Sequence, residues 1–90
     1  PTQALALMND PIFNEAATAF AARLIREVEG SDAKRLERAF RLVLGRSPEP
    51  AEQNRFLSFL KHQREDWNND AAWILACSVL LNLDETITRP

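Results

Sequence analysis

The sequence AAWILACSVLLNL, residues 71–83, is the most apolar stretch of the chain and contains only two polar residues. If it forms a helix, apolar side chains cover nearly the whole circumference of that helix instead of one stripe. A helix of this kind has to be enclosed by other elements on several sides. We therefore expect it to lie at the centre of the domain, with Asn68, Asn69 or Asp70 as its N-terminal cap.

Three segments before this stretch repeat apolar residues at spacings of three and four, the period of one face of a helix. The first starts at Pro11 and is expected to end at Gly30, the second follows a capping Ser31, and the third begins near Pro50. The side chains that this spacing turns inward are Phe13, Ala16, Ala17, Phe20, Ala21, Leu24 and Val28, then Leu36, Ala39, Phe40, Val43 and Leu44, then Phe56, Phe59, Leu60 and Trp67.

A short helix over residues 3–8, capped by Thr2, is expected to precede these segments. No alternating apolar pattern of a strand competes with the helical period anywhere in the sequence. The predicted fold is therefore all-α: a compact bundle of about five helices, with the last one central and apolar. Residues 1–90 are expected to form a single helical domain, and the chain is interpreted as a fragment of a larger protein.

The segment GRSPEP, residues 45–50, joins two of these helices. Gly45 can adopt the left-handed conformation that closes a helix, and the two prolines prevent the helix from continuing. Pro50 suits the first position of the next helix, with Glu52 at the third. A phosphate-binding loop would need several glycines and usually a lysine, so this segment is interpreted as a corner between helices.

Four polar residues are candidate site residues: Asn9, Asp10, Arg46 and Asn82. Asn9 and Asp10 precede a proline, which is typical of a helix cap, although Asp10 could instead bind a cation. Arg46 is expected to pair with Glu52 or with the last carbonyls of the preceding helix, and binding of an acidic ligand is the alternative. Asn82 is interpreted as a C-terminal cap or a buried amide.

His62 and Cys77 do not form a recognisable catalytic or metal-binding set. His62 lies in the polar run KHQRED, and a single His without a Cys partner is typical of a solvated residue. Cys77 lies in the most apolar helix, where a thiol is usually buried and unreactive. The sequence therefore predicts no metal and no cofactor in this chain, and shows no assembled catalytic residues.

The charge of the chain is unevenly distributed along its length. Residues 23–46 carry seven basic and four acidic residues, whereas residues 47–90 carry four basic and seven acidic residues, within a total of −2. This balance predicts no nucleic-acid partner, and the loop before Pro50 is longer than a helix-turn-helix motif usually has. The longest apolar run, residues 71–77, is too short to cross a bilayer, so no membrane insertion is expected.

Three segments carry a resemblance to a known family: PTQALALMNDPIF at the start, AFRLVLGRSPEPAE in the middle and WILACSVLLNLDETI near the end. Together they resemble a planctomycete-type family of proteins of unknown function, number 1553. The resemblance implies the C-terminal portion of a large, exported or periplasmic bacterial protein that often contains a cytochrome c-like module. Any haem would then lie elsewhere, because no Cys-x-x-Cys-His motif occurs here.

The sequence leaves three hypotheses about the function of this chain. The first is a helical accessory or interaction domain whose partners are other domains of the same chain. The second is a contribution to an active site shared with upstream domains and acting on carbohydrate, with Asn9, Asp10 or Arg46 taking part. The third is nucleic-acid binding, which the charge balance disfavours. The sequence does not set an oligomeric state.

Overall fold

The structure is a computed structural model that describes residues 11–83. It contains α2 (Pro11–Glu27), α3 (Asp32–Leu44), α4 (Pro50–Asp66) and α5 (Asn69–Asn82). No strand occurs among the described residues, so the predicted all-α fold is confirmed. The helix expected over residues 3–8 and the side chain of Phe13 lie outside the described part of the chain.

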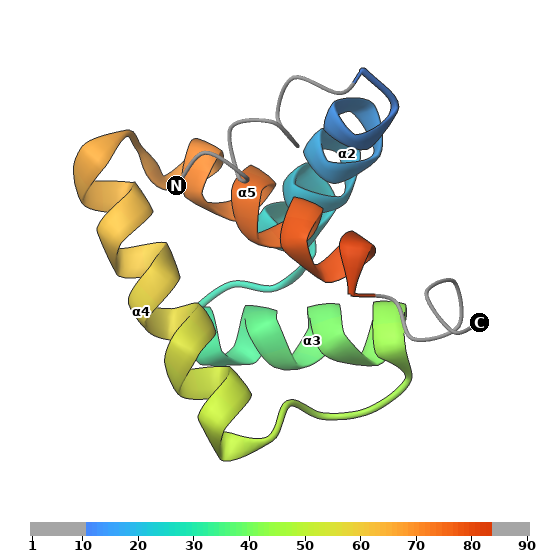
Figure 1. The fold of residues 1–90 in the computed structure, drawn as a ribbon, viewed down its shortest axis with the longest axis vertical. Coiled ribbons are helices and arrows are strands. Elements are labelled where there is room, and N and C mark those ends of the chain that lie inside the picture. The colour runs from blue at the N-terminus through green and yellow to red at the C-terminus, as the bar shows by residue number, and fades with distance from the viewer. Residues whose placement is uncertain (1–10, 84–90) are drawn as a thin grey trace.

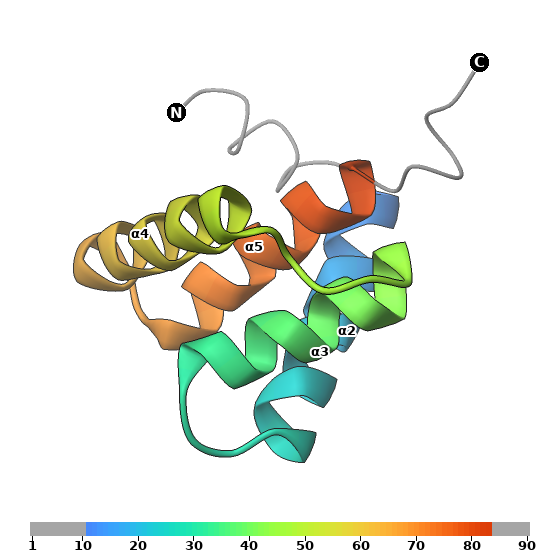
Figure 2. The same ribbon diagram turned by 90° about the horizontal axis from the view of Figure 1, so that it is seen from below.

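Helix α5 is the centre of the bundle, as its composition predicts. Figure 1 shows α5 between α2 and α4, and the view from below in Figure 2 shows α3 crossing beneath them. All three of these helices contact α5. The buried residues of α5 are Ala72, Trp73, Leu75, Ala76, Cys77, Ser78 and Leu80. The indole Nε1 of Trp73 has no hydrogen-bond partner among the described residues, so this side chain contributes packing and not a polar contact.

Two of the helix starts depend on side-chain caps that the sequence predicts. The Oγ of Ser31 accepts a hydrogen bond from the backbone N–H of Lys34 at 3.2 Å, and this cap begins α3. The Oδ1 of Asn68 accepts one from the N–H of Ala71 at 2.8 Å, so Asn68 is the cap of α5. Each cap satisfies a donor that the first turn of a helix leaves without a partner.

Helix α2 ends earlier than expected, at Glu27 instead of Gly30. The side chain of Arg35, from α3, supplies the reason, because its Nε donates to the carbonyl of Val28 at 2.7 Å and its Nη2 donates to that of Ile25 at 3.3 Å. These bonds satisfy carbonyls that the end of a helix leaves without partners. The chain then turns through Gly30, whose φ of 113° is easy only for glycine.

Two residues expected to face inward are exposed. Ala16 lies on the solvent side of α2, because Ala17, Ala21 and Leu24 form the stripe that packs inward. Trp67 is 62% exposed because it is the C-terminal cap of α4, where the backbone leaves the helical conformation and carries the side chain away from the stripe.

The interface between α3 and α4 is aromatic. The rings of Phe40 and Phe56 lie edge to face, with centroids 5.4 Å apart and an interplanar angle of 86°. Such a pair stabilises a contact beyond the area that it buries. The carboxylate of Asp32, at the start of α3, also accepts hydrogen bonds at 2.8 and 2.9 Å from Arg64, near the end of α4. The two helices are thus joined by an aromatic pair and by an ion pair.

We expect Leu80→Ala to lower the free energy of unfolding by about 2–5 kcal/mol, because Leu80 is completely buried in the central helix and its loss leaves a cavity. The same substitution at Leu42, which is 43% exposed on α3, is the matched control and should cost about 0.5 kcal/mol or less. Urea denaturation of both variants measures the difference. Equal losses of stability would contradict the central position of α5.

Candidate functional site

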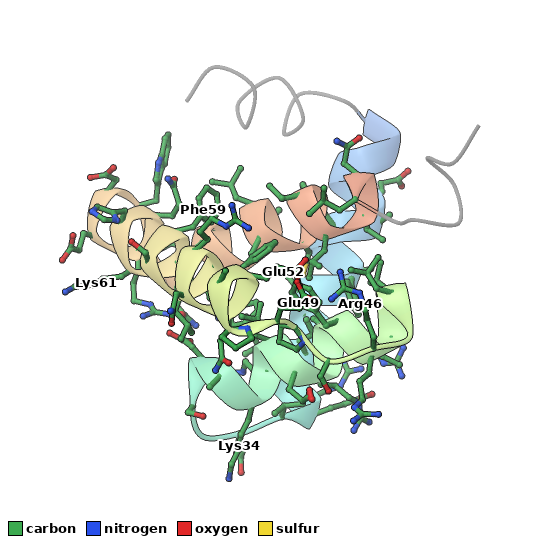
Figure 3. All side chains as sticks on the ribbon, turned by 60° about the horizontal axis from the view of Figure 1, so that its bottom comes forward. Lys34, Arg46, Glu49, Glu52, Phe59 and Lys61 are labelled. Atoms are coloured by element: carbon green, nitrogen blue, oxygen red, sulfur yellow. The ribbon has the colours of Figure 1, made fainter. Side chains whose placement is uncertain are left out.

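A groove lies between α4 and α5, and we call it the α4/α5 groove. Its volume is about 440 Å³. The residues that line it are Glu52, Arg55, Phe56, Phe59, Val79 and Leu83. Figure 3 places Phe59 on the opposite side of α4 from Lys61, which points away from the body of the domain.

The spacing of these residues explains why they meet. Positions 52, 55, 56 and 59 follow the three- and four-residue spacing of one face of a helix, and positions 79 and 83 are one turn apart on α5. Phe56 is buried at the floor of the groove, Phe59 and Val79 are half-buried, and Leu83 is 44% exposed. The α4/α5 groove is therefore an apolar surface that is open to solvent along one edge.

An ion pair closes the α3–α4 corner beside this groove. Arg46 donates two hydrogen bonds to the carboxylate of Glu52, from Nη1 at 2.8 Å and from Nη2 at 3.0 Å. The same carboxylate accepts the backbone N–H of Glu49 at 2.9 Å, and Glu52 therefore caps its own helix. The guanidinium of Arg46 also lies over the ring of Phe40, 5.6 Å from its centroid. Figure 3 shows Arg46, Glu49 and Glu52 gathered at this corner.

These contacts change the acidity of Glu52. The hydrogen bonds from Arg46 are the main cause, followed by the bond from the N–H of Glu49, and together they lower the pKa of Glu52 from 4.5 to about 2. The positive charges of Arg46 and Arg55 act in the same direction. Glu52 is therefore ionised at neutral pH, and Arg46 balances its charge.

Arg55 is the second charged residue of the groove, and its positive charge contributes to lowering the pKa of Glu52 on the same face of α4. Its side chain is exposed, and it makes no hydrogen bond or ion pair with the other described residues. Sequence reasoning missed Arg55 as a site residue. The signal that could have identified it is its position between Glu52 and Phe59 on one face of α4. The groove thus combines an apolar floor with one guanidinium that forms no hydrogen bond or ion pair within the described part of the chain.

The sequence-predicted site residues do not form one cluster in the described structure. Arg46 pairs with Glu52, as expected. Asn82 is exposed, and the C-terminal cap of α5 is Leu83, so the interpretation of Asn82 as a cap or a buried amide is wrong. The physical reason is that Asn82 is still part of α5 and lies on the face of this helix that is turned to solvent. Asn9 and Asp10 lie outside the described residues.

The lone histidine and the lone cysteine lie where the sequence predicts. His62 is exposed, with its Nδ1 2.8 Å from the carbonyl oxygen of Ser58. Cys77 is buried, and burial raises the pKa of its thiol to about 12. Between residues 11 and 83, no three His, Cys, Asp or Glu side chains gather in a way that could hold a metal ion. Over the same range, every helix is too short or too polar to span a bilayer.

We expect the stability that Glu52 contributes to depend on pH. Because folding lowers the pKa of its carboxyl group, this contribution is complete above about pH 4.5 and is lost as the pH falls toward about 2. The variant Glu52→Gln should be less stable than the unmodified chain by about 1 kcal/mol at neutral pH, and the difference should shrink over that acidic range. Urea denaturation at several pH values measures it.

The matched control for this measurement is Glu65→Gln, also on α4, where the carboxylate is exposed and makes no bond with the described residues. Its difference from the unmodified chain should stay small at every pH. A deficit of Glu52→Gln that has the same size in acid and at neutral pH would contradict a role of the ionised Arg46–Glu52 pair.

Comparison with known proteins places the chain in a family. A family model described as "Protein of unknown function (DUF1553)" matches residues 1–60, which include α2, α3 and the α3–α4 corner. No curated protein and no solved structure matches the chain. The match covers two thirds of the sequence and includes the first two of the three segments that resemble this family. The chain therefore belongs to the DUF1553 family of proteins of unknown function.

Proposed function

We propose that this chain is a helical accessory domain that binds another segment of the same, longer polypeptide in the α4/α5 groove. The bound segment is apolar and carries a carboxylate. The observation that supports this proposal is that one groove combines an open apolar floor with an exposed guanidinium that forms no hydrogen bond or ion pair with the described residues.

The apolar part of the proposal follows from the floor of the groove. Phe59, Val79 and Leu83 leave part of their surface in water, although the chain has a well-formed core beneath them. Adjacent exposed apolar side chains on a folded domain are typical of a surface that another segment covers. A groove between two helices suits an amphipathic helix, whose apolar face can lie along it.

The acidic part follows from the charge at the groove. Two charged residues line the groove, Glu52 and Arg55, and Glu52 is already balanced by Arg46. A segment that covered the groove with apolar residues alone would bring Arg55 close to a surface without a counter-charge. Such a buried, unpaired charge is costly, whereas a carboxylate on the segment would pair with it.

The wider setting belongs to the same proposal. We propose that the domain stands at the C-terminal end of a large exported bacterial protein, as the resemblance of its motifs implies, and that other domains of that protein supply the bound segment. Within that protein, the domain would organise its neighbours by contact and would not itself carry out the chemistry.

Photo-crosslinking in the complete polypeptide tests this function. A benzoyl-phenylalanine at position 59 should crosslink to another segment of the same polypeptide, and mass spectrometry should place the crosslink in an apolar sequence that contains Asp or Glu. The same amino acid at position 61, on the opposite side of α4, is the matched control and should give no such crosslink. Crosslinks only between separate molecules, or equal yields at both positions, would overturn the proposal.

Charge variants test the acidic part separately. In the chain that carries the crosslinker at position 59, Arg55→Glu should lower the crosslinking yield about tenfold, because it places two negative charges together. Arg55→Lys keeps the positive charge and should retain most of the yield. If Arg55→Glu leaves the yield unchanged, the bound segment is not held by a carboxylate.

A further inference from the structure

We propose that a second surface, formed by Arg23, Arg26 and Arg38 around Glu27, binds a carboxylate-rich protein surface. We call these three arginines and the glutamate the arginine cluster. It lies on α2 and α3, whereas the groove lies between α4 and α5. The inference therefore concerns a different surface from the one in the proposed function and does not depend on it.

The arginine cluster is assembled by the packing of α3 against α2. Within α2, the Nε of Arg23 donates to both oxygens of the Glu27 carboxylate, at 3.2 and 3.3 Å. The Nη2 of Arg26 is 4.0 Å from the same carboxylate. Arg38 comes from α3, and its Nη2 lies 3.8 Å from Oε1 of Glu27. Three guanidinium groups thus share one carboxylate.

This sharing leaves two positive charges in excess at one place on the surface. The side chains of Arg23, Arg26 and Arg38 are 47%, 72% and 51% exposed, so a partner can reach all three. Exposed ion pairs of this kind contribute little to stability, and the repulsion between neighbouring cations opposes them. The three arginines therefore contribute little to the stability of the fold. They do, however, provide positive charge that a negatively charged partner can bind.

Three acidic residues of α3 and α4 are paired with arginines outside the cluster, whereas Asp70 lines a hollow together with Arg26 and forms no ion pair with the other described residues. Asp32 and Glu52 are paired with Arg64 and Arg46, and Glu37 is paired with Arg41 at 3.5 Å. In addition, Arg35 directs its guanidinium to backbone carbonyls and not to a carboxylate. Counted over all its residues, Glu29 included, the segment 23–46 has a net charge of +3 in a chain whose total is −2.

The chemistry of the arginines and the charge of the whole chain together favour an acidic protein surface. A guanidinium can form two parallel hydrogen bonds with a carboxylate, which gives geometry as well as attraction. Phosphate would satisfy the same group, but the net negative charge of the chain and the −3 of residues 47–90 oppose the approach of a long polyanion such as DNA. A compact acidic patch would meet the cluster without facing that repulsion.

Fluorescence anisotropy with a labelled short peptide of consecutive glutamates, as a compact acidic probe, tests the proposal at low ionic strength. The triple variant Arg23→Gln, Arg26→Gln and Arg38→Gln should bind this probe at least about tenfold more weakly than the unmodified chain. The matched control is Lys34→Gln, Arg41→Gln and Lys61→Gln, which removes the same number of positive charges at exposed positions outside the cluster. Figure 3 shows Lys34 and Lys61 projecting from α3 and α4. The control should change the affinity by about threefold or less.

Three further measurements separate the possible outcomes. Thermal unfolding should show that both triple variants remain folded. If the cluster variant is unfolded, the single variant Arg26→Glu is measured in its place. It reverses the charge at the most exposed position of the cluster and should still weaken binding severalfold. Equal affinities of the two triple variants for the glutamate peptide would overturn the proposal. A short DNA duplex that binds the chain more tightly than the glutamate peptide would also overturn it, in favour of nucleic-acid binding.

Discussion

The fold depends on one constraint, which is the burial of a helix that is apolar around nearly all of its circumference. Because nearly every face of α5 is apolar, exposing any of them to water would be unfavourable. Helices α2, α3 and α4 all contact α5. The removal of this apolar surface from water is the dominant favourable term in folding a domain of this size. Trp73, which is completely buried, is the largest side chain in that centre.

The corner between α3 and α4 links this packing to the surface of the groove. Gly45, with φ of 73°, ends α3 in the left-handed conformation, and its N–H is bonded to the carbonyls of Phe40 and Arg41. The chain then carries Arg46 over the ring of Phe40 and against Glu52. Arg46 therefore contacts the aromatic ring of Phe40 and also balances the negative charge of Glu52 beside the groove. Arg55, on the next turn of α4 after Glu52, forms no hydrogen bond or ion pair with the other described residues.

Two surfaces of opposite character result from this arrangement. The α4/α5 groove is apolar with a single cation, whereas the arginine cluster on α2 and α3 is polar with two excess positive charges. A domain with two such surfaces can hold two neighbouring elements at a defined separation, because its helices are locked together by Arg35, Arg64 and the buried core. This rigidity is what the proposed function would use to organise neighbouring domains.

The sequence by itself determined the all-α class, the central helix and most of the helix boundaries, because apolar period, caps and glycine are local signals. It also indicated the Arg46–Glu52 pair, since both residues flank one short loop. The groove, the arginine cluster and the exposure of Trp67 and Asn82 were decided only by the tertiary structure. The reason is that each depends on where one helix lies against another, or on where a side chain points at a helix end, and the spacing of residues within one helix carries no such information.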